Sequence, residues 1–420
     1  MKRVVVTGAG AVTPAGVGLD SLWECVRSGR SRARRIDRFD ASRYQCQVAG
    51  QADEFDGAAW LPARLAKRTD RFTHLAMTAA AGALESAGVA VGPDGVPPHR
   101  VGVMVGNVLG GWEFAERELR ELWVAGPREV SPYQATAWFP AAPQGNICIQ
   151  HGIKGRARTF VCDRASGAYA LVHGAETIRR GHADVVLAGG SEQPLSPYAW
   201  LCCETAGYLT RHGNARPESA YRPFDRRHTG TVLGEGSVFL VLEDLDHARA
   251  RGASVLAELT GWALTTDGYQ PYYTVEPHGE TLGRAIEECL RRADVEPDQL
   301  GCVLADGTAV PREDAAEVYA IRAALGPAAR RVPVTAAKAA TGHLMGAAAV
   351  ADAAVALRAI AAREVPPVAN LEQPAPGFDL DFVIGEPRAV ERLDHALLVS
   401  RGLGGVNACL VMSGPNGARR

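Results

Sequence analysis

Short apolar runs and segments of helical periodicity alternate along most of the chain. An apolar run of about four to eight residues is typical of a buried strand, and apolar residues spaced three and four positions apart are typical of an amphipathic helix. The predicted strands cover residues 3–10, 100–105, 183–188, 238–243, 255–265, 303–306, 332–336, 396–400 and 408–413. The predicted helices cover residues 19–28, 72–88, 112–124, 170–180, 247–251, 281–293, 315–325 and 346–363.

This alternation predicts an α/β protein in which helices cover parallel sheets. The elements form two successive series of similar length, and the second series begins near residue 250. We therefore expect two halves, residues 1–250 and residues 251–420. A chain of this length can bury a large core in each half.

One predicted helix carries a separate apolar stripe. Its members lie at positions i, i+3, i+7 and i+10, on one face of the helix: Trp112, Ala115, Leu119 and Leu122. The pattern alone favours a stripe that packs against the protein core.

Composition and charge exclude several classes of function. The formal net charge is -2, which gives no electrostatic case for binding nucleic acid or an anionic membrane. No run approaches the ~18 uninterrupted apolar residues of a transmembrane helix, and the apolar run at the N-terminus is too short for a signal peptide. A glycine pattern at residues 8–10 resembles a dinucleotide fingerprint, but Thr13 takes the place of its third glycine. We expect no cofactor and no metal.

The cysteines indicate a reducing compartment. There are nine, an odd number without C-x-x-C spacing, which predicts a cytoplasmic protein with free thiols. Cys202 and Cys203 are adjacent, and we interpret both as small core residues in preference to a redox pair.

Candidate chemistry is concentrated in the segment from Thr159 to Gly167, with the sequence TFVCDRASG. Here an apolar strand pattern ends and a small-residue helical pattern begins. A side chain on such a turn lies at the positive end of a helix, where nucleophiles are commonly mounted.

This turn resembles the nucleophile turn of the β-ketoacyl synthases, condensing enzymes of the thiolase superfamily. The resemblance extends over nearly the whole chain and implies their duplicated fold with five layers, α-β-α-β-α. The other motifs that carry it are residues 6–14 (VTGAGAVTP), 181–190 (GHADVVLAGG), 223–225 (PFD), 234–236 (GEG) and 402–408 (GLGGVNA).

The resemblance also implies a degenerate catalytic site. A ketosynthase uses a Cys nucleophile and two His that promote decarboxylation and stabilise the enolate oxyanion. Aligned on the family motifs, Arg164 stands at the Cys position and Asp306 at the first His position. The second His is retained as His343, together with the Lys of its motif, Lys338. A guanidinium cannot form a thioester, and a carboxylate would repel an oxyanion.

Two alternatives stay open at this point. Cys162 would be a substitute nucleophile, although it precedes the turn by two positions. His343 would support acyltransferase or malonyl decarboxylase chemistry, or it would be a structural residue of a site that no longer reacts.

A subgroup of the family has this combination of losses, the chain-length factors (ketosynthase β-subunits) of type II polyketide synthases. The resemblance implies a heterodimer with a catalytic ketosynthase, which receives the acyl carrier protein, and an interface tunnel whose length Trp112, Ala115 and Leu119 would set. The subgroup commonly has Gln at the Cys position, so Arg164 is a departure. Buried, Arg164 would need carboxylates, and we expect Asp163 or Asp306. An Arg164–Asp306 pair would fill the former pocket.

Overall fold

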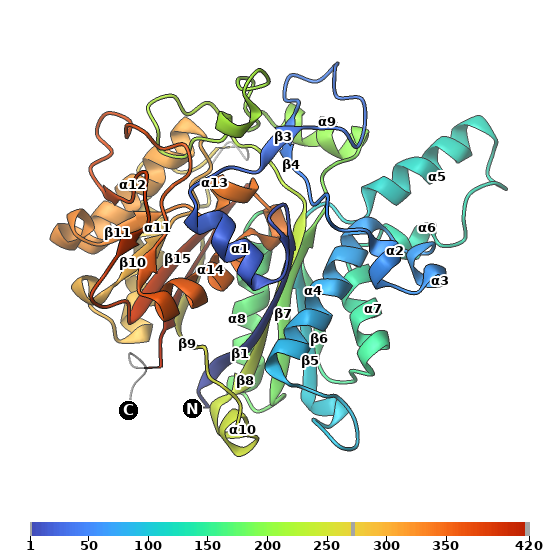
Figure 1. The fold of residues 1–420 in the computed structure, drawn as a ribbon, viewed down its shortest axis with the longest axis horizontal. Coiled ribbons are helices and arrows are strands. Elements are labelled where there is room, and N and C mark those ends of the chain that lie inside the picture. Colours follow the sequence, from blue (N-terminus) through green and yellow to red (C-terminus); the bar gives the residue numbers. More distant parts are fainter. Residues whose placement is uncertain (1, 270–273, 416–420) are drawn as a thin grey trace.

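The computed structural model describes residues 2–269 and 274–415, and its core is one 12-stranded mixed sheet that bends between two halves (Figure 1). The first half contributes β1 (Val4–Thr13), β2 (Gly16–Val17), β5 (Val101–Gly106), β6 (Ala157–Phe160), β7 (Val185–Glu192) and β8 (Gly236–Asp244). The second contributes β9 (Ala257–Thr266), β10 (Cys302–Leu304), β11 (Pro333–Thr335), β13 (Asp381–Phe382), β15 (His395–Gly402) and β16 (Val406–Ser413). Small separate ribbons are formed by β3 (Ala33–Arg35) with β4 (Val48–Gly50) and by β12 (Glu364–Val365) with β14 (Arg388–Ala389).

The two halves repeat one strand order. The first half runs β6-β5-β7-β8-β1 and the second β11-β10-β15-β16-β9. In both, the first three strands are parallel to one another and the last two are antiparallel to their neighbours. The prediction of purely parallel sheets was therefore wrong, while the predicted duplication is confirmed. The boundary near residue 250 stays a prediction.

Helices complete the predicted five layers (Figure 1). In the middle, α8 (Ser166–Arg179) and α14 (Ala348–Ala362) pack against each other and against both halves of the sheet. The outer layers are α4 (Arg71–Ala87) with α7 (Ala142–His151), and α11 (Glu280–Ala293) with α12 (Pro311–Leu325). The remaining helices are α1 (Leu19–Arg27), α2 (Gly57–Trp60), α3 (Ala63–Ala66), α5 (Trp112–Val124), α6 (Gln134–Ala137), α9 (Pro197–Thr205), α10 (Leu245–Ala250) and α13 (Lys338–Thr341).

The central helix α14 is unusually apolar. The segment Met345–Ala362 would be long and apolar enough to cross a membrane, with a mean hydropathy of 1.6, but 83% of it is buried inside the protein. A helix covered on both sides by sheets has to be apolar all round, so its composition follows from its place in the middle layer.

The adjacent cysteines have different environments. Cys203 is buried, as predicted, whereas Cys202 is exposed on α9, so its prediction as a core residue was wrong. Neighbouring residues of a helix point in different directions, and on α9, which lies at the surface, the core-facing direction is taken by Cys203.

Close packing at glycines brings the start of α8 against the sheet. A Cβ atom at Gly106, the last residue of β5, would lie 2.3 Å from the carbonyl carbon of Ser166. One at Gly190 of β7 would lie 2.3 Å from the carbonyl oxygen of Gly346. Gly106 therefore lets the start of α8 lie directly on the sheet, and Gly190 does the same for the turn before α14.

We expect Gly106→Ala to lower the free energy of unfolding by about 1–3 kcal/mol, because the added methyl group forces the turn away from the sheet. Urea denaturation measures this change. Gly145→Ala is the matched control, because a Cβ atom there meets nothing within 4 Å and α7 favours alanine over glycine. Equal stability of the two variants would contradict the packing argument.

Candidate functional site

The turn between β6 and α8 has the geometry that the motif predicted. Asp163 lies in the left-handed region with φ 47, which is rare for a residue other than glycine. The Oγ of Ser166 donates to the carbonyl oxygen of Asp163 and accepts from the N–H of Cys162 at 2.8 Å. These bonds hold Arg164 at the tip of the turn.

Arg164 is buried, with 1% of its surface exposed. Its Nη1 donates to Oε2 of Glu313 at 2.8 Å, and its Nε donates to Oδ2 of Asp163 at 3.3 Å. The Tyr208 ring lies 5.6 Å from the guanidinium carbon. Burial lowers the pKa of Arg164, but the charges of Glu313 and Asp163 outweigh it, so the net pKa is well above its ordinary value. The guanidinium therefore stays charged, and it is neutralised by carboxylates from both halves of the chain.

The predicted Arg164–Asp306 pair was wrong, while the expected Asp163 contact is confirmed. Asp306 follows β10 and instead faces Lys338 and His343, with its Oδ1 3.6 Å from Nζ and 3.7 Å from Nε2. Burial alone would raise the pKa of Asp306. The positive charge of Lys338 and the contact with His343 lower it, and the net pKa is below the ordinary value. Asp306 is thus a carboxylate.

Lys338 connects this carboxylate to the central layer. Its ammonium donates to Asp352 of α14 and to the carbonyl oxygen of Ala305 at 3.2 Å. The Asp306–Lys338–Asp352 chain is almost completely inaccessible to solvent. The positive charge of Lys338 is therefore neutralised by two carboxylates, which indicates a structural role.

His343 is buried and neutral. Burial lowers its pKa despite the neighbouring Asp306. Its Nδ1 accepts the backbone N–H of Met345 at 3.0 Å, so the ring proton resides on Nε2, which faces the Asp306 carboxylate. The N–H that would serve an oxyanion therefore lies 3.7 Å from a negative charge, too far for a hydrogen bond.

Two further acidic groups shape the site. Glu317 of α12 accepts the N–H groups of Asp306 and Gly307 at 2.6 and 2.9 Å, and burial with the adjacent Asp306 charge raises its pKa to about 8. Glu192 at the end of β7 accepts the N–H groups of Val108 and Leu109 at 2.7 and 3.0 Å. These contacts fix the loops that flank Arg164.

Cys162 is half-buried, and burial raises the pKa of its thiol. The thiolate is the reactive form of cysteine, and an activated cysteine has a lowered pKa. Among the residues that the structure describes, no group of His, Cys, Asp and Glu could hold a metal ion.

Trp112, Ala115 and Leu119, the residues predicted to set the length of a tunnel, do not belong to the site around Arg164. They lie on α5, which projects from the body of the protein (Figure 1). Trp112 packs against Tyr198 and Trp138, with ring centroids 4.7 and 6.3 Å apart. Ala115 is buried, whereas Leu119 is 38% exposed. The core-facing interpretation of the stripe was therefore wrong, because part of the stripe lies on the protein surface.

Sequence reasoning missed the partners of the site, namely Glu313, Glu317, Glu192, Asp352 and Tyr208. One signal was available for the first two. Glu313 and Glu317 lie one turn apart on one face of an alanine-rich helix, and this acidic face follows the Asp306 segment directly in the sequence. Their partners come from segments far away in the chain, and spacing does not identify them.

Comparison with known proteins assigns the family. Residues 1–248 match the family described as "Beta-ketoacyl synthase, N-terminal domain", and residues 256–372 match "Beta-ketoacyl synthase, C-terminal domain". The chain belongs to the β-ketoacyl synthase family. Within it, the chain is similar to the ketosynthase β-subunits of type II polyketide synthases, the subgroup that the motifs indicated.

One relative is the tetracenomycin polyketide synthase ketoacyl synthase beta subunit of Streptomyces glaucescens, 41% identical over 97% of this chain and 98% of its own length. The solved structure of the ishigamide ketosynthase/chain length factor matches with a TM-score of 0.89 and 29% identity, covering 98% of this chain and 99% of that chain. A type II acyl-carrier protein in complex with its ketosynthase bound to the hexaketide matches with a TM-score of 0.89 and 26% identity, again covering 98% and 99%.

We expect Glu313→Gln to lower the free energy of unfolding by about 3–5 kcal/mol, because it removes the closer of the two carboxylates that neutralise the buried Arg164 guanidinium. Urea denaturation at neutral pH measures the loss. The double variant Arg164→Gln/Glu313→Gln should lose less than the two single variants combined, since it leaves neither charge without its partner.

Glu288→Gln is the control for this experiment, because it removes a carboxylate whose ion pairs with Arg291 and Arg292 lie at the surface of α11. We expect its unfolding curve to coincide with that of the unchanged protein. If Glu313→Gln behaved like Glu288→Gln, the buried pair would have no role in stability.

Proposed function

We propose that this chain is the non-catalytic, length-determining subunit of a type II polyketide ketosynthase. One observation carries the proposal: the guanidinium of Arg164, which the motif aligns with the thioester-forming cysteine, is buried and paired with Glu313 and Asp163. The catalytic subunit would supply the cysteine, receive the acyl carrier protein and carry out decarboxylative condensation. The proposal assigns no cofactor to this chain and keeps a cytoplasmic location.

The surroundings of Arg164 support the absence of condensation chemistry. Condensation needs a thiolate to hold the acyl chain and donors that stabilise an enolate oxyanion. Cys162 has a raised thiol pKa, and the Nε2–H of His343 faces the Asp306 carboxylate at 3.7 Å. An oxyanion placed beside Asp306 would meet a negative charge.

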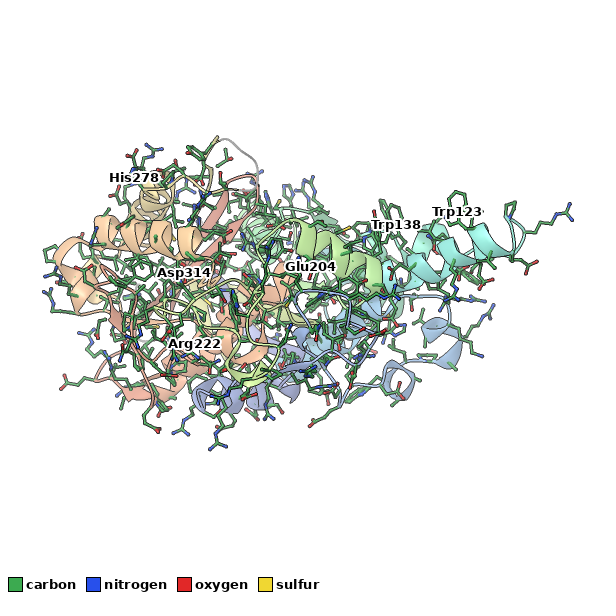
Figure 2. All side chains as sticks on the ribbon, turned by 90° about the horizontal axis from the view of Figure 1, so that it is seen from above. Trp123, Trp138, Glu204, Arg222, His278 and Asp314 are labelled. Atoms are coloured by element: carbon green, nitrogen blue, oxygen red, sulfur yellow. The ribbon has the colours of Figure 1, made fainter. Side chains whose placement is uncertain are left out.

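An exposed apolar surface supports pairing with a second subunit. Large apolar side chains on α5, α7 and the segment between them are open to solvent, which marks an interaction site in a soluble chain. They are Trp123 and Val124 at 80%, Ile149 at 81%, Phe139 at 53% and Trp138 at 37% exposed. Figure 2 shows Trp123 near the tip of the projecting helix and Trp138 closer to the body. We call these five residues the apolar arm.

The stripe on α5 supports a role in chain length. Trp112 lies at the base of the apolar arm, packed against Tyr198 and Trp138, while Ala115 beside it is small. A tunnel that runs between this helix and a partner would be closed by the indole of Trp112. Leu119 would line its wall, because it is partly exposed on the same side.

The alternative is an active acyltransferase or malonyl decarboxylase on the same fold. The observation that favours it is the retained His343 with its Nε2–H, together with a half-buried Cys162 in the turn before α8. It requires the chain to act without a partner.

Reconstitution separates the two functions. We expect malonyl-carrier protein to be condensed only when this chain and the candidate ketosynthase are combined, and condensation to stop when the partner's cysteine is replaced by alanine. Each subunit is also assayed alone by mass spectrometry of the carrier-bound products. Decarboxylation or condensation by this chain alone, lost on His343→Ala, would establish the alternative.

Trp112→Gly should lengthen the product by at least one malonyl-derived unit, because it removes the ring that would close the tunnel. The product of the reconstituted pair is identified by mass spectrometry. Trp60→Gly, which removes a tryptophan 54% exposed on α2, is the matched control and should leave chain length unchanged. Unchanged length in Trp112→Gly, with normal turnover, would remove Trp112 from the tunnel.

A further inference from the structure

The strand β6 forms an open edge of the sheet. It is the last strand of its half and pairs within the described chain only with β5. The carbonyl oxygen of Arg156 accepts from Val103 of β5, and that of Phe160 accepts from Asn107, directly after β5. Since backbone groups alternate along a strand, those of Ala157 and Thr159 face outward. An open edge of this kind is a template for a strand of another chain.

This edge is strongly basic on its α8 side. Arg156 and Arg158 are exposed and line a cavity of about 200 Å³ together with His173, Arg180 and Glu176. Glu176, the single carboxylate among the lining residues, lies 3.4 Å from Arg180 and 3.8 Å from His173. Within the described chain, the guanidinium groups of Arg156 and Arg158 form no hydrogen bond or ion pair.

The edge is continuous with the apolar arm. Val161, directly after β6, is 57% exposed, and α7, which carries Ile149, packs beside β6. A partner that covers the apolar arm would therefore also meet the β6 edge.

Pairing of two copies of this chain through β6 would bring arginine side chains of like charge together. Consider two β6 strands paired antiparallel about a two-fold axis. If the axis passes through Ala157, Arg158 of one copy lies opposite Arg156 of the other; if it passes through Arg158, the two Arg158 side chains lie opposite each other. If it passes through Thr159, the two Arg158 side chains are diagonal neighbours. Like charges at such positions oppose pairing, and charged side chains on edge strands are a recognised means of preventing self-association. The same charges attract carboxylates.

We propose that Arg156 and Arg158 prevent this chain from pairing with itself and select a partner whose matching edge strand carries Asp or Glu. This inference rests on the proposed function for the identity of the partner, a catalytic ketosynthase subunit. The arginines then decide between homodimer and heterodimer, while the apolar arm supplies the contact area.

The test compares the full-length chain with its Arg156→Gln/Arg158→Gln variant, co-expressed with the candidate ketosynthase. Native mass spectrometry of the purified material counts homodimers and heterodimers. We expect the unchanged chain to form heterodimers, and the variant to raise the share of its own homodimers at least about tenfold and to weaken the heterodimer in low salt. Arg331→Gln is the matched control, because Arg331 is exposed and belongs to the second half of the chain. It should change neither the share of homodimers nor the stability of the heterodimer.

Two outcomes would overturn the inference: a variant with no more homodimer than the unchanged chain, or an unchanged chain that is itself mainly homodimeric. If no preparation forms a heterodimer but the variant alone becomes homodimeric, the charge inference stands and the proposed function fails. Circular dichroism and urea midpoints of the separated chains confirm that the variant is folded.

Discussion

A buried positive charge has to be neutralised, and the ion pair between Arg164 and Glu313 satisfies this constraint across the middle of the molecule. Arg164 belongs to the turn before α8 in the first half, and Glu313 lies in the first turn of α12 in the second half. Removing one member of a buried ion pair lowers the free energy of unfolding several times more than removing one member of an exposed pair. The pair therefore ties the relative position of the two halves to the charge of one side chain.

Asp163 extends this connection to a third segment. Its carboxylate accepts from Nε of Arg164 and from the backbone N–H of Leu403 at 2.6 Å, and its backbone is held in the left-handed region. The 402–408 turn is further ordered by Asn407, whose Nδ2 donates to Asp267 at 2.6 Å. Strain at Asp163 is thus retained because side-chain bonds on both sides specify the conformation.

The sequence predicted the elements well and their pairing less well. Strong amphipathic periodicity located α4, α5 and α11, and apolar runs located the long strands, since burial itself produces these patterns. The antiparallel direction of β8 and β16 had no such signal, because a strand buried on both faces is apolar whichever way it runs. The stripe on α5 also had two interpretations, since a chain interface and a core require the same apolar side chains.

The candidate site was also predicted only in part: its own residues were located from the sequence, but their partners were not. Motifs located Arg164, Asp306, Lys338 and His343, because those residues lie at fixed offsets within local turns. The partner of Arg164 depended on which of several carboxylates the fold brings within reach. Asp306 was the nearer candidate by motif, but its charge is already neutralised by Lys338, which left Glu313 for the guanidinium. Local sequence specifies a charge, and only the tertiary arrangement assigns its partner.

The former nucleophile turn and the basic edge are parts of one continuous segment. β6 ends at Phe160, and Arg164 follows within the same tight turn, so whatever fixes the turn also fixes the strand that precedes it. In a catalytic family member the turn needs room for an acyl chain at its tip. Here the tip is filled by a charged side chain with its own buried partners. The hydrogen bonds and ion pairs of this tip fix the turn, and the turn leads directly to the edge at which we propose that the partner binds.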